Sequence, residues 1–466
     1  MKISFSKKDG AISAVSRVIF TESERDEVIR ENDDLVLNIG IGKKEEFNRR
    51  KLPLVIRRAL ITAKKNKVTK IYLEFPTMFS KILKLKSEEL AEIIGVNLEL
   101  ANYQFVNYKT APKEGWGFIE EVIILDDTKA SIRKAFTRGQ EIGKAVNATR
   151  ELSNTPGGEM TPKVLAKSAQ DSALGTKVKV TVLDKKKMTK LGMGAVLGVA
   201  QGSIEEPKFI ITEYWGGKKN DAPIVLVGKG VTFDSGGVNV KTGDYMLGMN
   251  MDMSGGAAVI QTIVLLAKLG VKKNVVALVP AVENMPSGAS YRPGDVLKSM
   301  SGKMIEIRNT DAEGRVILAD ALTYAKQYKP KVVIDVATLT GAAVVALGER
   351  ASAIFTKSDK LSDFLIKTGE ETNEYLWRLP LWDEYEADIK GEVGDVTNTH
   401  NKNSRYGGAI NGAIFLYQFT KDYDKNCAWA HIDIAPRMEA ISEDNLASGA
   451  LGTPVRLLTK FVEDWK

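Results

Sequence analysis

The residues best suited to chemistry lie in one stretch of the sequence, where carboxylates and lysines are set among glycines. The apolar run 224–227 leads into Lys229 and Asp234, and Asp252 follows after a further polar segment. Glycine allows close approaches and backbone conformations that a Cβ would block, which suits a tightly built site. Taken singly, Asp234 and Asp252 would more commonly be turn-forming or helix-capping acids. Their joint position behind an apolar strand makes them candidates for a site.

A second acidic cluster lies in the heptapeptide 309–315, Asn-Thr-Asp-Ala-Glu-Gly-Arg, directly before an apolar helix predicted for residues 316–325. Asp311 and Glu313 are two residues apart, so in an extended segment their side chains point to the same side. Two such carboxylates could share one polar target. A capping aspartate followed by a glutamate at the start of a helix would explain the same residues and stays open as an alternative.

Carboxylates gathered in a pocket of low dielectric constant would repel one another strongly unless cations neutralised them. Two divalent ions would supply that compensation, and oxygen ligands suit magnesium, manganese or zinc. Paired ions in two-metal hydrolases lie roughly 3.5 to 4 Å apart. The chain has only two histidines, His400 and His431, so a histidine-dominated zinc site is not expected.

The segments around these residues are predicted to alternate between strands and helices. Strand-like runs are predicted at 208–214, 223–227, 274–279 and 331–339, each followed by loop residues and a helical pattern. This order indicates a mainly parallel sheet flanked by helices. Functional residues of such sheets gather in loops that leave the carboxyl ends of strands. The segments after Val227 and before Val316 are therefore expected to form the site.

The first part of the chain predicts a smaller α/β domain. Strands are expected at 35–41, 70–75 and 120–125, separated by helical patterns. A long helix is expected at 129–152, and breaker residues at 154–158 end it. A single core stops growing at roughly 250 to 300 residues. We therefore expect an N-terminal α/β domain at 1–150 and a larger catalytic domain at 151–466.

Composition excludes several other classes of protein. Hydrophobic residues make up 44% and charged residues 27%, as in an ordinary globular protein. No stretch approaches the ~18 to 20 uninterrupted apolar residues that span a bilayer, and the N-terminus lacks the features of a secretory signal. Cys427 is the only cysteine, which rules out an intrachain disulfide and a thiolate zinc cluster. A cytoplasmic protein without membrane attachment is the expectation.

These segments resemble a known family. The heptapeptide 309–315 is identical to the signature of the leucyl aminopeptidase (cytosol aminopeptidase) family. The resemblance continues through 228–237, 252–253, 337–342 and 429–435, and reaches back to 154–156 and 191–195. The first 150 residues resemble the family only in being an α/β domain of the right size. The resemblance implies an aminopeptidase that removes leucine and other mainly apolar residues from the N-terminus of peptides, using water activated by two metals.

By position, the resemblance also implies the metal ligands. One ion would be held by Lys229, Asp234, Asp252 and Glu313, and a second by Asp234, Asp311 and Glu313. Asp234 and Glu313 would bridge the two ions, which would be manganese or zinc, with magnesium as an alternative. A lysine amine binds a metal only when deprotonated, so the neighbouring ion would have to lower the pKa of Lys229 strongly.

The resemblance further implies groups that assist the reaction. Lys241 would polarise the scissile carbonyl and stabilise the oxyanion, and Arg315 would hold a bicarbonate ion that acts as general base. Met249, Thr338 and Gly341 would line the pocket for the first side chain. Family members form hexamers with enclosed active sites. A homohexamer acting on short peptides with a free N-terminus is therefore expected.

Three residues, Asn250, Pro436 and Thr453, replace those usual in the family, and these departures bear on fine specificity and subunit contacts.

Two segments and the overall charge allow other interpretations of the sequence. Residues 234–237 are similar to the nucleophile segment of trypsin-like proteases, but a β-barrel is not expected here. Residues 192–198 resemble a dinucleotide loop whose third glycine is one residue late, so helix–sheet packing is favoured. Some bacterial relatives bind DNA, and the pI of about 9.0 keeps such an additional role open, although the basic residues form no stripe.

Overall fold

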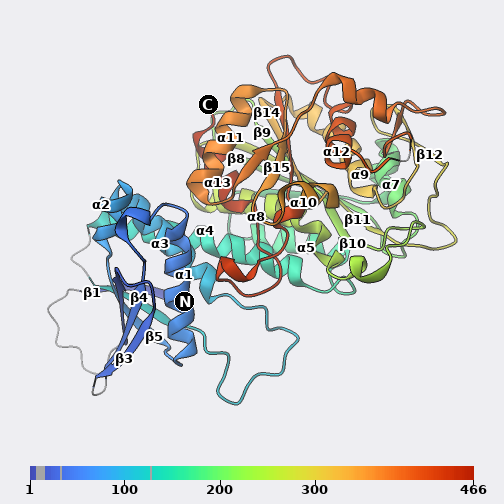
Figure 1. The fold of residues 1–466 in the computed structure, drawn as a ribbon. Coiled ribbons are helices and arrows are strands. Elements are labelled where there is room, and N and C mark those ends of the chain that lie inside the picture. The colour runs from blue at the N-terminus through green and yellow to red at the C-terminus, as the bar shows by residue number, and fades with distance from the viewer. Residues whose placement is uncertain (7–15, 32–33, 126–128, 403) are drawn as a thin grey trace. The chain divides into compact units, whose positions relative to one another are not determined.

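The chain folds into two compact units, drawn in Figure 1. A computed structural model describes residues 1–6, 16–31, 34–125, 129–402 and 404–466. One unit comprises Met1–Asn147 and Ala440–Gly449, and the other comprises Ala148–Glu439 and Ala450–Lys466. The division falls within helix α4 (Ala130–Asn154). Within the described ranges, no helix combines the length and apolar character needed to cross a bilayer.

The first unit is built on a six-stranded sheet with the order β1-β6-β5-β2-β4-β3. Its strands are β1 (Lys2–Ser6), β2 (Ser16–Thr21), β3 (Glu27–Glu31), β4 (Asp34–Gly40), β5 (Lys70–Glu74) and β6 (Glu121–Leu125). Neighbouring strands are parallel except for β3 and β4. Leu35, Leu37 and Ile39 of β4 join a core that also includes residues of α1 (Lys51–Lys65), α2 (Thr77–Leu83) and α3 (Ser87–Asn102). The three strands predicted in this region are confirmed.

The second unit contains a nine-stranded sheet with the order β16-β15-β18-β14-β9-β11-β8-β7, and β10 pairs with β11. Its strands are β7 (Lys179–Leu183), β8 (Lys208–Trp215), β9 (Ile224–Gly228), β10 (Gly230–Asp234), β11 (Asn274–Asn284), β14 (Val332–Ala337), β15 (Ser352–Phe355), β16 (Leu376–Arg378) and β18 (Ala428–Asp433). The four central strands β18, β14, β9 and β11 are parallel. β8 and β15 run antiparallel to their central neighbours β11 and β18. The predicted mainly parallel sheet is confirmed.

Helices cover both faces of this sheet, as Figure 1 shows for α11 and α13 on one side and α9 and α12 on the other. One layer contains α5 (Pro162–Ala173), α8 (Ser254–Lys268), α11 (Asp359–Thr372) and α13 (Val455–Asp464), and the other contains α6 (Lys185–Lys190), α7 (Gly194–Ala200), α9 (Glu313–Ala325) and α12 (Gly408–Tyr417). Ile224 and Leu226 of β9 belong to one core, and Val225 and Val227 belong to the other. Because both faces are buried, this strand appears in the sequence as a continuous apolar run.

Two of the three glycines at 192–198, Gly194 and Gly198, serve helix–sheet packing as predicted, whereas Gly192 has a φ of 72° and no atom within 4 Å of its Cβ position. A Cβ on Gly194 would lie 2.2 Å from the carbonyl oxygen of Lys298, and one on Gly198 would lie 2.5 Å from the side chain of Leu297. Both contacts are with β12 (Val296–Lys298), a strand of a small sheet with β13 (Met304–Glu306) and β17 (Val396–Thr397). These two glycines therefore let α7 approach that sheet closely.

Candidate active site

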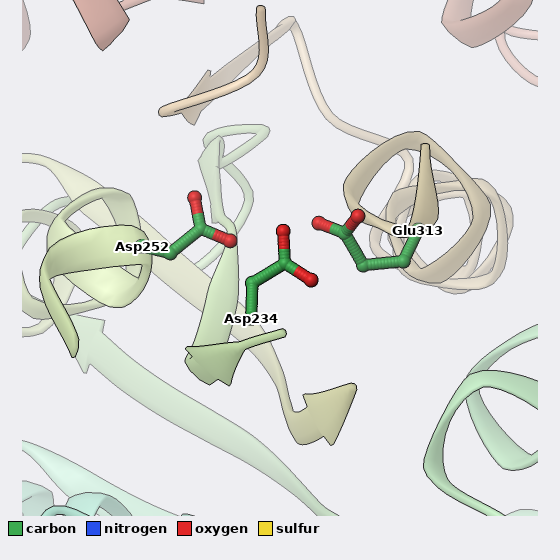
Figure 2. A group of neighbouring side chains, drawn as sticks. All are labelled: Asp234, Asp252 and Glu313. Atoms are coloured by element: carbon green, nitrogen blue, oxygen red, sulfur yellow. The ribbon is translucent and has the colours of Figure 1, made fainter. Parts of the chain in front are cut away.

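The candidate metal ligands come from separate elements that meet near the carboxyl ends of strands β9 and β10. Lys229 follows β9, Asp234 ends β10, Asp252 lies in the 3-10 helix η3 (Met249–Met253), and Glu313 begins α9. Figure 2 shows the carboxylates of Asp234, Asp252 and Glu313 pointing toward one another. One oxygen of each lies within 4.8 Å of the others, and all three residues are buried. The fold thus brings together acids that are far apart in the sequence.

Lys229 lies between two of these carboxylates. Its Nζ is 2.8 Å from Asp252 Oδ1 and 2.9 Å from Glu313 Oε1. A Cβ on Gly314 would lie 2.5 Å from Lys229 Cε, so the glycine makes room for the lysine side chain. Burial by itself would lower the pKa of Lys229, but the surrounding carboxylates outweigh burial and raise it. In this arrangement the ammonium group balances part of the negative charge.

Lys241 joins the other side of the cluster. Its Nζ lies 2.9 Å from Asp234 Oδ2 and 2.5 Å from Asp311 Oδ1. The Asp311 side chain is 34% exposed, whereas that of Asp234 is 3% exposed, so Lys241 links the outer and the buried carboxylates. Burial opposes the charge of Lys241, but Asp234, Glu313 and Asp311 together raise its pKa. Lys241 is therefore a cation at neutral pH.

The prediction that Asp311 and Glu313 lie in an extended segment is wrong. Asp311 is in a turn, and Glu313 is the first residue of α9. The N-cap of α9 is Ala312, which makes no side-chain cap hydrogen bond, so capping does not explain Asp311 either. The change from turn to helix directs Asp311 to Lys241 and Glu313 to Lys229.

The turn-forming alternative is correct for one oxygen of Asp234. Asp234 Oδ1 accepts hydrogen bonds from the backbone N–H of Gly236 at 2.9 Å and from Asn284 Nδ2 at 2.8 Å. Its Oδ2 faces Lys241 instead. Asp252 does not cap the helix that follows it, because the N-cap of α8 is Met253 and makes no side-chain cap hydrogen bond. Both aspartates thus keep oxygens for the pocket.

Mutual repulsion and burial perturb the four acids. Burial, followed by the charges of Glu313 and Asp252, raises the pKa of Asp234 well above its ordinary value. Burial also raises the pKa of Asp252 to about 6, and it raises the pKa of Asp311. Burial would raise the pKa of Glu313 as well, but Lys229 and Lys241 outweigh it and lower this pKa. Two lysines therefore do not fully offset the crowding of negative charge.

The donor set fits divalent cations. Asp252 Oδ2 and Asp311 Oδ1 are buried and accept no hydrogen bond of good geometry. Each nonetheless lies close to a lysine, at 2.8 Å for Asp252 Oδ2 and 2.5 Å for Asp311 Oδ1, so their contacts are ionic. Oxygens of this kind in a crowded carboxylate cluster are the usual ligands of hard divalent ions.

The cluster opens onto a pocket of about 480 Å³, a size common for small-molecule sites. Every residue that the sequence analysis singled out for the site lines this pocket: Lys229, Asp234, Lys241, Met249, Asp252, Asp311, Glu313, Arg315, Thr338 and Gly341. A Cβ on Gly341 would meet nothing within 4 Å, so the pocket is open there. Tyr245 and Arg405 also line it, and the sequence analysis identified neither.

Arg315 is a buried cation beside this pocket. Its Nη1 donates to the carbonyl of Asn398 at 3.0 Å. Its Nε is buried and has no hydrogen-bond partner among the described residues. Burial lowers the pKa of Arg315 to about 10, so the guanidinium stays charged at neutral pH. A charged N–H group without an acceptor suits a bound anion.

Sequence reasoning missed the polar residues that hold the active-site loops together. Asn284, at the end of β11, donates its Nδ2 to Asp234 Oδ1 at 2.8 Å and to the carbonyl of Thr310 at 2.9 Å. Thr310 Oγ1 donates to the carbonyl of Gly236 at 2.6 Å and accepts from the N–H of Asn239 at 2.8 Å. Asn284 follows an apolar strand, which is the same signal that pointed to Asp234, so that signal could have found it.

Two of the three departures from the family pattern are bonded within the protein. Asn250 Nδ2 donates to the carbonyl of Ser153 at 2.9 Å. Thr453 Oγ1 donates to Glu374 Oε1 at 3.2 Å. Pro436 is part of a short 3-10 helix, Ala435–Arg437.

Comparison with known proteins places this site in a family. The catalytic domain of the cytosol aminopeptidase family matches residues 147–459, and the N-terminal domain of that family matches residues 28–112. A probable cytosol aminopeptidase of Rickettsia massiliae (strain Mtu5) is 41% identical over 471 aligned positions, which cover 100% of this chain and 90% of the relative. One of Ralstonia pickettii (strain 12J) is 41% identical over 438 positions, covering 92% and 84%.

A solved structure is similar over the whole fold. The bottromycin maturation enzyme BotP in complex with Mn superposes with a TM-score of 0.86 at 29% identity, covering 96% of this chain and 98% of that one. The match of the N-terminal domain goes beyond the resemblance seen in the sequence, which there was limited to size and class. With both domains matched and relatives aligned over nearly their whole length, the chain belongs to the cytosol aminopeptidase family.

Proposed function

We propose that this protein uses two divalent cations to hydrolyse the N-terminal residue of short peptides, with leucine and other apolar residues preferred. Membership of the cytosol aminopeptidase family makes the protein an aminopeptidase. The observation that supports the two-metal proposal is the convergence of three buried carboxylates, Asp234, Asp252 and Glu313, within 4.8 Å of one another. Their negative charge requires cations, and the pocket beside them has room for a peptide end.

The proposed ligands are the residues that surround the point where these carboxylates meet. Asp234, Asp252 and Glu313 would hold one ion together with Lys229, which must lose its proton to bind a metal. Asp234, Asp311 and Glu313 would hold the second. Manganese, zinc or magnesium fits a set composed mainly of carboxylate oxygens, and the similar BotP structure contains Mn. When bound, the ions would acidify a water molecule and polarise the scissile carbonyl.

Lys241 and Arg315 have the charge and burial for assisting roles. Lys241 is held by Asp234 and Asp311 and remains protonated, so it can stabilise negative charge that develops on the carbonyl oxygen. Arg315 has a buried N–H without an acceptor and can hold a bicarbonate ion. An anion held there would accept a proton as general base.

The preference for apolar first residues rests on the pocket wall. Met249 contributes an apolar side chain, and Gly341 leaves space. Thr338 donates its hydroxyl to Asp252 Oδ1 at 2.7 Å, so this group is already occupied. A substrate side chain would meet few free polar groups at these three positions, which favours leucine or methionine over polar residues.

Metal removal and N-terminal blocking test the proposal together. Protein dialysed against a chelator should lose hydrolysis of leucine amide, and added manganese or zinc should restore it. N-acetyl-leucine amide should remain intact under all conditions, because the free amine is expected to contribute to binding. Full activity in metal-free protein would contradict the two-metal mechanism. Comparable rates on the acetylated compound would contradict recognition of the free amine.

We further propose a cytoplasmic homohexamer, on the strength of the family resemblance. Light scattering of the purified protein should give a mass near six times the chain mass of 51.1 kDa. Enclosed active sites would restrict substrates to short or unstructured peptides, so folded proteins should resist digestion. A monomer in solution would argue against the assembly.

A further inference from the structure

We propose that Arg405 binds the C-terminal carboxylate of the substrate, so that the enzyme prefers peptides of two or three residues with a free C-terminus. This inference rests on the aminopeptidase function proposed above and names the class of peptide that fits the same pocket. Arg405 lines the pocket onto which the carboxylate cluster opens. It is exposed, whereas Asp234, Asp252 and Glu313 are buried, so Arg405 belongs to the outer part of the pocket wall.

Arg405 differs from the other cations of the pocket in having no acceptor. Lys229 and Lys241 each contact two carboxylates, and Arg315 donates to a backbone carbonyl. Over the described part of the chain, the Arg405 guanidinium forms neither an ion pair nor a hydrogen bond. A guanidinium presents five N–H donors in a planar fork that matches both oxygens of a carboxylate. Arg405 is thus a free anion-binding group at the mouth of the pocket.

The backbone next to Arg405 is hydrogen-bonded to a helix. Tyr406 N–H donates to Ser404 Oγ at 3.1 Å, and Asn411 Nδ2 donates to the carbonyl of Tyr406 at 3.1 Å. Asn411 lies in α12, and Gly407 is the N-cap of that helix, with φ of 61° in the left-handed region. A glycine adopts this conformation without strain. These contacts fix the backbone that carries Arg405 relative to α12.

Peptide length follows from the two ends of the pocket. A substrate whose amine lies at the buried carboxylates would direct its other end toward the mouth. An extended chain spans at most ~3.3 to 3.6 Å per residue, so two or three residues extend roughly 7 to 11 Å. The pocket volume of about 480 Å³ can contain such a peptide. The C-terminal carboxylate of a longer peptide would lie outside, where Arg405 could not select it.

The test compares short peptides of two lengths that carry a carboxylate at the C-terminus, on a side chain or nowhere. KM and kcat are measured for Leu-Gly, Leu-Gly-Gly, their C-terminal amides and Leu-Asp-amide, whose only carboxylate is on the second side chain. Arg405→Gln should raise the KM of the free acids about tenfold, as expected for loss of a charge-assisted pair near the surface. The KM of the glycine amides should change less than about twofold. Arg405→Lys keeps the charge but loses the planar fork of N–H donors, so its KM for the free acids should lie between those of the wild type and Arg405→Gln.

Arg292→Gln is the matched control, because Arg292 is an exposed arginine paired with Asp295 and does not line the pocket. It should behave as wild type with every peptide. Equal increases in KM for acids and amides in the Arg405 variant would overturn the inference. An effect confined to Leu-Asp-amide would also overturn it, because the partner would then be a side-chain carboxylate. If the wild-type protein cleaves none of these peptides, the proposed function itself fails; if it cleaves all of them equally well, only the role of Arg405 fails.

Discussion

The second unit buries carboxylates in two contrasting environments. In the pocket, Asp234, Asp252 and Glu313 face one another and two lysines. Outside it, Asp320 and Asp433 are fully buried, yet neither carboxylate belongs to this cluster. Asp320 accepts hydrogen bonds from the backbone N–H groups of Val196 at 2.9 Å and Met300 at 2.7 Å. Its oxygens accept from the protein backbone, whereas each pocket carboxylate has at least one oxygen in contact with a lysine.

The carboxylate of Asp433, like that of Asp320, accepts hydrogen bonds from backbone N–H groups. It accepts from the N–H of Leu339 at 3.0 Å, from the N–H of Ala435 at 3.1 Å and from Thr340 Oγ1 at 2.6 Å. Leu339 and Thr340 line the active-site pocket, so Asp433 supports the pocket wall from behind. Asp433 is hydrogen-bonded to this loop and does not itself line the pocket.

Burial and a raised pKa do not separate the two environments. Burial raises the pKa of Asp252 to about 6 and the pKa of Asp320 to about 7. The difference lies in where the oxygens point, because those of Asp320 meet backbone N–H donors, whereas those of Asp252 meet Lys229, the Thr338 hydroxyl and the other acids of the cluster. Acids with perturbed pKa values are more frequent at functional sites, but structural acids can have them as well. Here the orientation of the oxygens distinguishes a site from a structural support.

The largest effect on activity is expected from Asp234→Ala. This change removes the proposed bridge between two ions, so metal content as well as hydrolysis should be lost. Elemental analysis should find fewer than two ions per chain, while circular dichroism should show an intact fold. If the variant still holds two tightly bound ions, Asp234 is not a metal ligand, and the proposed difference between the pocket carboxylates and the backbone-bonded ones does not apply to it.

Lys241→Ala should lower kcat by roughly 10² to 10³, the effect of removing one donor that stabilises an oxyanion. Both metals should stay bound, because Lys241 is proposed to act on the substrate rather than on the ions. KM should change little, since the charge matters most in the transition state. Metal loss in this variant would show that Lys241 supports the ligands instead.

Asp433→Ala should reduce kcat/KM roughly tenfold, equivalent to ~1.4 kcal/mol, because the loop containing Leu339 and Thr340 loses its anchor. Both ions should remain bound. Asp433→Asn keeps one carbonyl oxygen and should be milder. If Asp433→Ala lost metal as Asp234→Ala is expected to, metal binding in the pocket would depend on Asp433, which its hydrogen bonds do not indicate.

Asp320→Ala should leave kcat and metal content unchanged and should lower stability alone. The change orphans the N–H groups of Val196 and Met300, at about 1 to 3 kcal/mol for each buried unsatisfied group. Thermal unfolding with bound metal would measure the loss, and Asp320→Asn should recover part of it. Reduced activity at a temperature where the variant is folded would contradict a purely structural role.

Several features of the protein were predictable from local sequence. Strand β9 is buried on both faces and therefore appears as an apolar run, and β14 is apolar except for Asp335. The acids were predictable because they follow such strands among glycines or lie in the heptapeptide 309–315. The turn before Glu313 was not predicted, because spacing alone does not distinguish an extended segment from the start of a helix.

The remaining features depend on contacts between distant residues. The antiparallel direction of β8 relative to β11 is set by pairing, and an apolar run has no direction of its own. Asn284 reaches Thr310 across 26 residues, and Lys229 reaches the carbonyl of Thr338 across 109. Side-chain type and periodicity are local properties, so the chemically suited residues and the strand-forming segments could be identified from the order of the residues. Which oxygens face cations and which face backbone donors follows from the folded arrangement, because hydrogen bonds and charge interactions act over a few ångströms in space, whatever the separation along the chain.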